Sequence, residues 1–142
     1  MVYLFDVNVV LALFDPAHEH HSAAHAWYRG EREWASCPLT ENAVIRIASS
    51  ASYPGSPGSP AVIASMLDRF RSDSQHIFWP DDITLLNQQL FPGLQAVGSR
   101  QLTDIYLLGL AVSKGGKLAT LDRSIPASAV RDGAAALELI PF

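Results

Sequence analysis

Five short apolar runs divide the chain, and the stretches between them space their apolar residues as helices do. The runs are Val2–Phe5, Trp34–Cys37, His76–Trp79, Lys117–Leu121 and Leu137–Ile140. Strands that alternate with helices favour right-handed crossovers and a mainly parallel sheet with helices on both faces. The pattern therefore predicts a single three-layer α/β/α domain over residues 1–142, with a central sheet of five strands.

Capping residues predict the boundaries of two helices. Ser59 followed by Pro60 combines an N-cap residue with proline at the first helical position, which predicts a helix through about Ser72. A second helix is expected near Ala17–Arg29, where Gly30 follows as a stop. The Pro-, Gly- and Ser-rich stretch Ser52–Pro60 between helices is interpreted as a surface loop, with a mobile flap near a site or interface as the alternative.

Two further helix starts are expected in the second half of the chain. Asp81 or Asp82 can cap a helix that follows Pro80, and Thr103 can cap the helix that carries Asp104. The run Lys114-Gly115-Gly116 gives that second helix a basic last turn and a glycine stop.

Composition describes an ordinary globular protein, with 49% hydrophobic and 17% charged residues. The longest apolar run, Val9–Phe14, is too short to span a membrane, and the start of the chain lacks the basic residues of a signal peptide. Cys37 is the only cysteine, which excludes an internal disulfide and fits a reducing cytoplasm. A net charge of −4 argues against binding nucleic acid through bulk positive charge, but it permits a nuclease that engages phosphate through bound cations.

Four acidic residues stand where a strand ends or a helix begins. Asp6 and Asp122 end apolar runs, whereas Glu41 and Asp104 lie in the first turns of predicted helices. In an open parallel sheet these positions all fall at the carboxyl edge of the strands, where ligands bind. Carboxylates gathered without basic partners repel one another, and a divalent cation is the commonest reason for such a cluster.

The faces of the two helices support this reading. The residues three, four and seven positions after Glu41 and Asp104 are all apolar: Val44, Ile45, Ala48, Leu107, Leu108 and Ala111. Both acids therefore stand at the head of apolar faces. Each acid alone has an ordinary explanation as a strand end, a helix-start charge or a turn former, and their coincidence is what favours a metal site.

Four segments carry the acids and follow one another along the chain: Asp6-Val7-Asn8, Pro38-Leu39-Thr40-Glu41-Asn42, Gln101-Leu102-Thr103-Asp104 and Ala119-Thr120-Leu121-Asp122-Arg123. In this order they resemble the PIN-domain ribonucleases, and more narrowly the VapC toxins of bacterial and archaeal toxin–antitoxin pairs. The resemblance covers nearly the whole chain and includes Ala51–Gly55 and Phe78–Asp82.

The resemblance implies an endoribonuclease that hydrolyses RNA phosphodiester bonds with Mg²⁺, or Mn²⁺ as a substitute, and that a cognate antitoxin protein holds inactive. It also implies a cytoplasmic homodimer. Asp6, Glu41, Asp104 and Asp122 would form the acidic metal site, and Asn8 and Thr120 would orient the carboxylates, water or phosphate. Family members often carry a histidine shortly before the Thr-Asp pair, where this chain has Ser99, whose hydroxyl could bond a phosphate or water.

Three other functions remain open from the sequence. The chain could be a PIN nuclease that acts in RNA processing or on DNA without an antitoxin. It could be a phosphoacceptor or phosphatase domain with Asp6 as nucleophile, although only Lys114 and Lys117 could supply the lysine that such sites need. It could also be a catalytically silent binding module that keeps the fold.

Several other residues have competing interpretations. His18, His21 and His25, with His20 beside them, can share a helical face, interpreted as solvated, with a transition-metal site as the alternative. Arg46 is expected to serve at the surface, whereas Arg100 and Arg123 are the better candidates for phosphate contact. The remaining candidates are expected to be core residues: Trp27, Trp34, Trp79 and Cys37.

Overall fold

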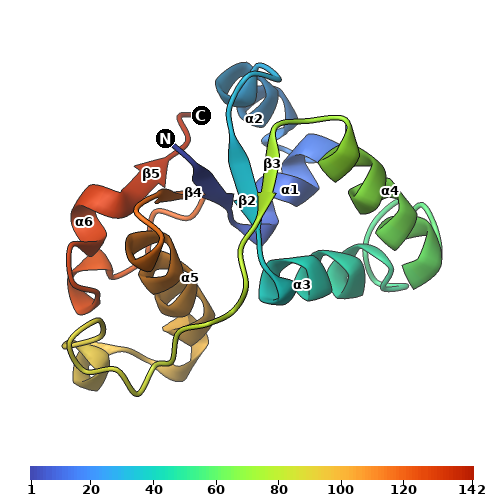
Figure 1. Cartoon of the computed structure of the whole chain (residues 1–142). Coiled ribbons are helices and arrows are strands. Elements are labelled where there is room, and N and C mark those ends of the chain that lie inside the picture. Colours follow the sequence, from blue (N-terminus) through green and yellow to red (C-terminus); the bar gives the residue numbers. More distant parts are fainter.

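An all-parallel sheet of five strands organises the computed structural model, which describes residues 1–142 (Figure 1). The strands are β1 (Tyr3–Phe5), β2 (Trp34–Ser36), β3 (His76–Phe78), β4 (Lys117–Thr120) and β5 (Leu137–Leu139). Their order across the sheet is β3-β2-β1-β4-β5, so the first strand lies at the centre. All five predicted strands are confirmed, and each predicted run is one residue longer than the strand it contains.

Six α-helices connect and cover these strands. They are α1 (Val7–Phe14), α2 (His21–Tyr28), α3 (Pro38–Ala48), α4 (Pro60–Ser72), α5 (Leu102–Ser113) and α6 (Gly133–Ala136). Three single turns of 3₁₀-helix, η1 (Leu94–Ala96), η2 (Ser99–Gln101) and η3 (Ala127–Ala129), lie in the connections before α5 and α6. None of the helices is long and apolar enough to cross a membrane.

The two faces of the sheet bury two separate cores, because neighbouring residues of a strand point to opposite sides. Phe5, Trp34 and Ala119 pack with residues of α1 to α4, whereas the adjoining Leu4 and Leu118 pack with residues of α5 and α6. Figure 1 shows this division, with α5 and α6 on one side of the strands and α1 to α4 on the other. The predicted three-layer α/β/α architecture is confirmed.

The start of α4 and the end of α5 follow the predicted capping chemistry. The Ser59 hydroxyl accepts a hydrogen bond from Val62 N at the start of α4, and Pro60 is its first residue. Helix α5 ends at Ser113, and Gly115 follows with a φ of +71°. Helix α2 is shorter than the predicted Ala17–Arg29, because residues 17–20 form turns before it begins.

Two predicted caps are wrong. No helix follows Pro80, and Asp81 instead accepts hydrogen bonds from Leu39 N at the start of α3 (3.0 Å) and from the hydroxyl of Tyr106 (2.8 Å). Thr103 is not the N-cap of α5, because the turn η2 runs directly into a helix that already begins at Leu102. At the first position, distant hydrogen-bond partners use the Asp81 side chain. At the second, the preceding turn η2 starts the helix one residue before Thr103.

The segment Ser52–Pro60 is a surface connection between α3 and α4, as predicted, except that its last residue, Pro60, already begins α4. Two hydrogen bonds attach its first half to the body of the protein. The Tyr53 hydroxyl donates to Asp15 Oδ2 at 2.8 Å, and the Ser56 hydroxyl donates to the Ala48 carbonyl at 2.7 Å.

Among the glycines, Gly109 in α5 leaves the least room for a side chain. A Cβ at this position would lie 2.3 Å from Cζ of Phe91, whose ring is itself buried. We expect Gly109→Ala to lower the free energy of unfolding by about 1–3 kcal/mol, since overpacking outweighs the gain of about 1 kcal/mol in helix propensity. Urea denaturation measures the change. Adding Phe91→Leu should recover part of the loss, and a Gly109→Ala variant more stable than the original protein would contradict the packing.

Candidate functional site at the carboxyl edge of the sheet

Three of the four predicted acids converge at the carboxyl edge of the two central strands. Asp6 follows β1 directly, Asp122 lies two residues beyond β4, and Asp104 is in the first turn of α5. Strands β1 and β4 are neighbours, with Phe5 opposite Ala119, so the residues after them emerge side by side. The three carboxylates interact electrostatically: burial and then the charges of Asp6 and Asp122 raise the pKa of Asp104.

Asp6 is the most firmly held of the three. The residue is 5% exposed, and its backbone N–H donates to the Ala119 carbonyl at 3.0 Å. Oδ1 accepts from Val7 N at 2.8 Å as the N-cap of α1, and Oδ2 accepts from the Thr120 hydroxyl at 2.7 Å. Burial raises the pKa of Asp6, an effect that these two hydrogen bonds oppose and the nearby Asp122 reinforces.

Thr120 and Asn8 form the polar network behind the acids. The buried Thr120 hydroxyl donates to Asp6 and accepts from Asp122 N at 3.0 Å and from Asn8 Nδ2 at 3.3 Å. Asn8 Oδ1 accepts from Leu121 N at 3.2 Å, which fixes the orientation of the amide. The residues predicted as orienting neighbours therefore contact Asp6 and the backbone that carries Asp122.

The other two aspartates keep more of their oxygen atoms free. Asp122 Oδ1 accepts from the backbone N–H and hydroxyl of Ser124, at 2.8 and 2.6 Å, and Oδ2 has no hydrogen bond within the protein. Asp104 is half-buried and accepts no hydrogen bond from the protein. Burial first, then the charges of Asp6 and Asp122, raise the pKa of Asp104 to about 6.

The donor set suits a hard divalent cation. No lysine, arginine or histidine forms an ion pair with Asp6, Asp104 or Asp122, so no basic side chain compensates their mutual repulsion. Carboxylate oxygens are the ligands that Mg²⁺ prefers, with several waters retained. As the side chains lie, no three His, Cys, Asp or Glu residues gather closely enough to hold one ion by themselves. An ion at this edge would need waters or substrate oxygens to complete its ligands.

Glu41 is placed differently from the three aspartates. It lies in the first turn of α3, as predicted, but a basic residue pairs with it. Arg71 of α4 donates from Nη1 to Glu41 Oε2 at 3.0 Å, and the Ser36 hydroxyl donates to the same oxygen at 2.5 Å. His76 Nε2 in turn lies 2.8 Å from Ser36 Oγ. Sequence reasoning missed both partners of Glu41 and the histidine behind Ser36; only Ser36, at a strand end five residues before an acid, carried a visible signal.

The histidine-rich segment has a structural use that the sequence did not predict. His21 Nδ1 lies 2.7 Å from the Ala12 carbonyl, and His25 Nε2 lies 2.9 Å from the Leu13 carbonyl. These carbonyls are in the last turn of α1, where no later helical residue is available to bond them. His25 is exposed and the other three histidines are partly exposed, as expected of a solvated face. Two of the four, His21 and His25, also bond the end of α1, and their rings stack edge-to-face with centroids 4.4 Å apart.

The two arginines predicted to contact phosphate, Arg100 and Arg123, have different surroundings. Arg100 in η2 is exposed, as are Ser99 beside it and Arg46 on α3. The Arg123 guanidinium donates to the carbonyls of Leu121 and Ile140, at 3.4 and 3.3 Å, and lies 3.9 Å from the ring centroid of Phe142. Arg123 therefore holds the last residues of the chain against the end of β4.

The predicted core residues are buried. Trp34 is fully buried and stacks between Phe5 and Phe70, with ring centroids 4.8 Å apart in both pairs, and Trp27 and Trp79 are each 8% exposed. Cys37 is buried, and burial raises the pKa of its thiol to about 11, which keeps it unreactive.

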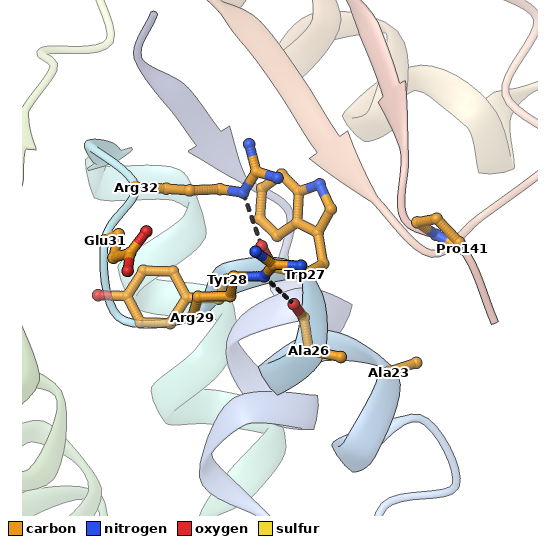
Figure 2. Close-up of a pocket in the computed structure, with 8 residues that line it drawn as sticks. All are labelled: Ala23, Ala26, Trp27, Tyr28, Arg29, Glu31, Arg32 and Pro141. Carbon is orange, nitrogen blue, oxygen red and sulfur yellow. Dashed lines mark hydrogen bonds between the residues drawn. The ribbon is translucent and has the colours of Figure 1, made fainter.

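The largest surface hollow lies away from the acids. Figure 2 shows this pocket of about 570 Å³ at the end of α2, with the Arg32 side chain lying over the ring of Trp27 and Pro141 across from it. The Arg32 guanidinium is 4.2 Å from the Trp27 ring centroid, and its Nε donates to the Trp27 carbonyl at 2.7 Å. None of the four predicted acids lines the pocket, so size alone does not locate the site.

The fold and the acidic edge define a PIN-like α/β/α domain. A solved structure, VapBC2 from Rickettsia felis bound to a DNA fragment from their promoter, matches the fold with a TM-score of 0.59 and 14% identity, covering 89% of this chain and 94% of that one.

Relatives in sequence identify the family within this fold class. The chain is 41% identical over 129 residues to Ribonuclease VapC44 of Mycobacterium tuberculosis, covering 89% of this chain and 90% of that protein. It is 37% identical over 131 residues to Ribonuclease VapC39 of the same organism, covering 91% and 94%. No family model matches. The chain therefore belongs to the VapC ribonuclease family.

The raised pKa of Asp104 predicts how stability depends on pH when no metal is present. Its value of about 6 lies above the ordinary 3.8, so between these values the folded state binds more protons than the unfolded state. We expect the free energy of unfolding in EDTA to fall as the pH rises from about 4 to about 6. Urea denaturation across this range measures the slope.

Asp104→Asn should flatten this slope and raise stability at pH 7, because it removes a charge that burial and the neighbouring aspartates disfavour. Asp68→Asn, at an exposed carboxylate of α4, is the matched control and should keep the slope of the original protein. Parallel curves for the original protein and Asp104→Asn would contradict the raised pKa of Asp104 in the folded protein.

Proposed function

We propose that this protein is a metal-dependent endoribonuclease and the toxin of a toxin–antitoxin pair, which hydrolyses RNA phosphodiester bonds. The observation that carries the proposal is the convergence of Asp6, Asp104 and Asp122 without a basic partner. Membership of a family whose relatives are named ribonucleases supports the same chemistry.

Asp6, Asp104 and Asp122 would hold Mg²⁺ or Mn²⁺, with Glu41 as the fourth acid of the site. When bound, such an ion supplies Lewis-acid polarisation of the scissile phosphate, a nucleophilic water and stabilisation of the leaving oxygen. Without the ion, the three aspartates would repel the phosphates of RNA. The charge of the bound ion would therefore allow a protein with a net charge of −4 to bind RNA.

The residues around the acids have orienting roles in this proposal. The Thr120 hydroxyl donates to Asp6 Oδ2, which leaves the remaining lone pairs of that carboxylate for a cation or its water. Asn8 holds both Thr120 and the backbone of Leu121, so it fixes the turn that presents Asp122. Outer hydrogen bonds of this kind set the orientation of metal-binding side chains.

The proposed partners follow from the charge of the site. A cognate antitoxin would place a segment with basic character against the acidic edge, where it would compete with RNA. The match to a VapBC2 complex supports an antitoxin partner, and a homodimer belongs to the same proposal.

The positions of the two lysines argue against the phosphoacceptor alternative. Lys114 Nζ is 2.7 Å from Asp82 Oδ2, and Lys117 Nζ is 3.7 Å from Glu138 Oε1. Because each lysine pairs with a different acid, neither forms an ion pair with Asp6, the nucleophile that this alternative needs.

Cleavage of structured RNA tests the proposed reaction. We expect cleavage with Mg²⁺ or Mn²⁺ and none in EDTA. Asp6→Asn and Asp104→Asn should each lower the rate by more than the roughly 10–100-fold that is typical for loss of an outer-shell partner. Asp68→Asn should cleave as the original protein does. Metal-independent cleavage, or full activity in both site variants, would refute the mechanism.

Competition between antitoxin and RNA gives a second test. Adding the cognate antitoxin to saturation should suppress cleavage, because both ligands would occupy the acidic edge. The rate of RNA cleavage by the purified, saturated complex measures this. Undiminished cleavage would place the antitoxin on another surface.

A further inference from the structure

The two oxygens of Glu41 have unequal environments. Oε2 accepts both hydrogen bonds that reach the carboxylate, from the Ser36 hydroxyl at 2.5 Å and from Arg71 Nη1 at 3.0 Å. Oε1 accepts none from the protein. The side chain of Glu41 is 19% exposed, so its orientation is held inside the structure rather than averaged by water.

The hydrogen-bond chain that ends at Oε2 has one possible direction. The Ser36 hydroxyl carries a single proton, and the Glu41 carboxylate can only accept, so Ser36 donates to Glu41. The second contact of Ser36, 2.8 Å from His76 Nε2, then requires the ring nitrogen to be the donor. His76 therefore carries its proton on Nε2 and donates to Ser36.

The surroundings of His76 keep the ring neutral and in place. Burial, together with the charge of Arg71, lowers the pKa of His76 to about 4. The ring packs edge-on against Trp34, with centroids 4.6 Å apart, and Trp34 is the residue opposite His76 in the parallel pairing of β2 and β3. Ser36 is itself 3% exposed. The chain from His76 to Glu41 is thus built into the sheet.

Arg71 completes the arrangement from the other side. Its guanidinium lies 5.7 Å from the ring centroid of Phe78, the last residue of β3, and pairs with Glu41 from α4. The charge of Glu41 is therefore compensated within the protein, unlike the charges of Asp6, Asp104 and Asp122. An acid with a fixed basic partner and one free oxygen differs in kind from three mutually repelling acids.

We infer that Ser36, His76 and Arg71 are positioning residues of the metal site, which hold Glu41 so that Oε1 is its only oxygen available to a cation or a cation-bound water. This inference rests on the proposed function. The three residues act through Glu41 and contact neither the ion nor the RNA. Their contribution is preorganisation, because a fixed carboxylate does not lose rotamer freedom when the ion binds.

Cation affinity tests the inference without relying on catalysis. Calorimetric titration of the protein with Mn²⁺ should show about 10–100-fold weaker binding for Ser36→Ala, the range for loss of an outer-shell partner. The Mg²⁺ concentration that gives half-maximal RNA cleavage should rise in parallel, while cleavage at saturating Mg²⁺ recovers. Arg69→Gln, at an exposed arginine of the same helix as Arg71, should leave both measurements unchanged.

A pair of His76 variants separates positioning from folding. His76→Gln keeps an N–H donor near the position of Nε2 and should retain most of the Mn²⁺ affinity, whereas His76→Leu should lose affinity as Ser36→Ala does. Thermal melting identifies any variant that fails to fold, and if Ser36→Ala is one of them, the His76 pair decides. Original Mn²⁺ affinity in folded Ser36→Ala, or in folded His76→Leu, would overturn the inference.

The protonation of His76 gives a readout that is independent of any metal. Nitrogen chemical shifts of the ring at pH 7 should report the neutral form protonated on Nε2, and an Nδ1-protonated ring would overturn the hydrogen-bond chain. This result stands even if the protein binds no cation and cleaves no RNA. Failure of the proposed function would instead appear as absent Mn²⁺ binding in the original protein.

Discussion

The carboxylate of Asp6 is buried, which is unfavourable for its charge. Much of the site depends on the hydrogen bonds that hold this carboxylate in place. Burial opposes ionisation, whereas the hydrogen bonds from Val7 N and Thr120 and the N-terminus of α1 favour it. The same bonds tie the end of β1 to the start of α1 and to the end of β4. Because Thr120 also accepts from Asp122 N, one hydroxyl sets the positions of two acids.

The four acids at the carboxyl edge of the sheet are of two kinds. Asp6, Asp104 and Asp122 have no basic partner, and their charges raise the pKa values of Asp104 and Asp6, which is the electrostatic condition for binding a divalent cation. Glu41 is paired with Arg71 and oriented by Ser36. The unpaired aspartates would supply the attraction for the ion, and the paired glutamate would supply a fixed direction of approach.

The sequence predicted most of what depends on local pattern. The five strands followed from short apolar runs, and the placement of three aspartates followed from parallel topology, since strand ends and helix starts share an edge. Contacts between distant segments were beyond such reasoning. Asp81 contacts the start of α3, His21 bonds the end of α1, and Arg71 reaches Glu41 across thirty positions of sequence, and only tertiary packing brings these pairs together.

The location of bound Mn²⁺ tests the central claim most directly. Crystals of the protein grown or soaked with Mn²⁺ and measured for anomalous scattering would show the ion as a distinct peak. The account predicts a peak between the carboxylates of Asp6, Asp104 and Asp122, with Oε1 of Glu41 on the same side as the ion or its waters. A fully occupied Mn²⁺ site elsewhere, with no peak among the three aspartates, would contradict it.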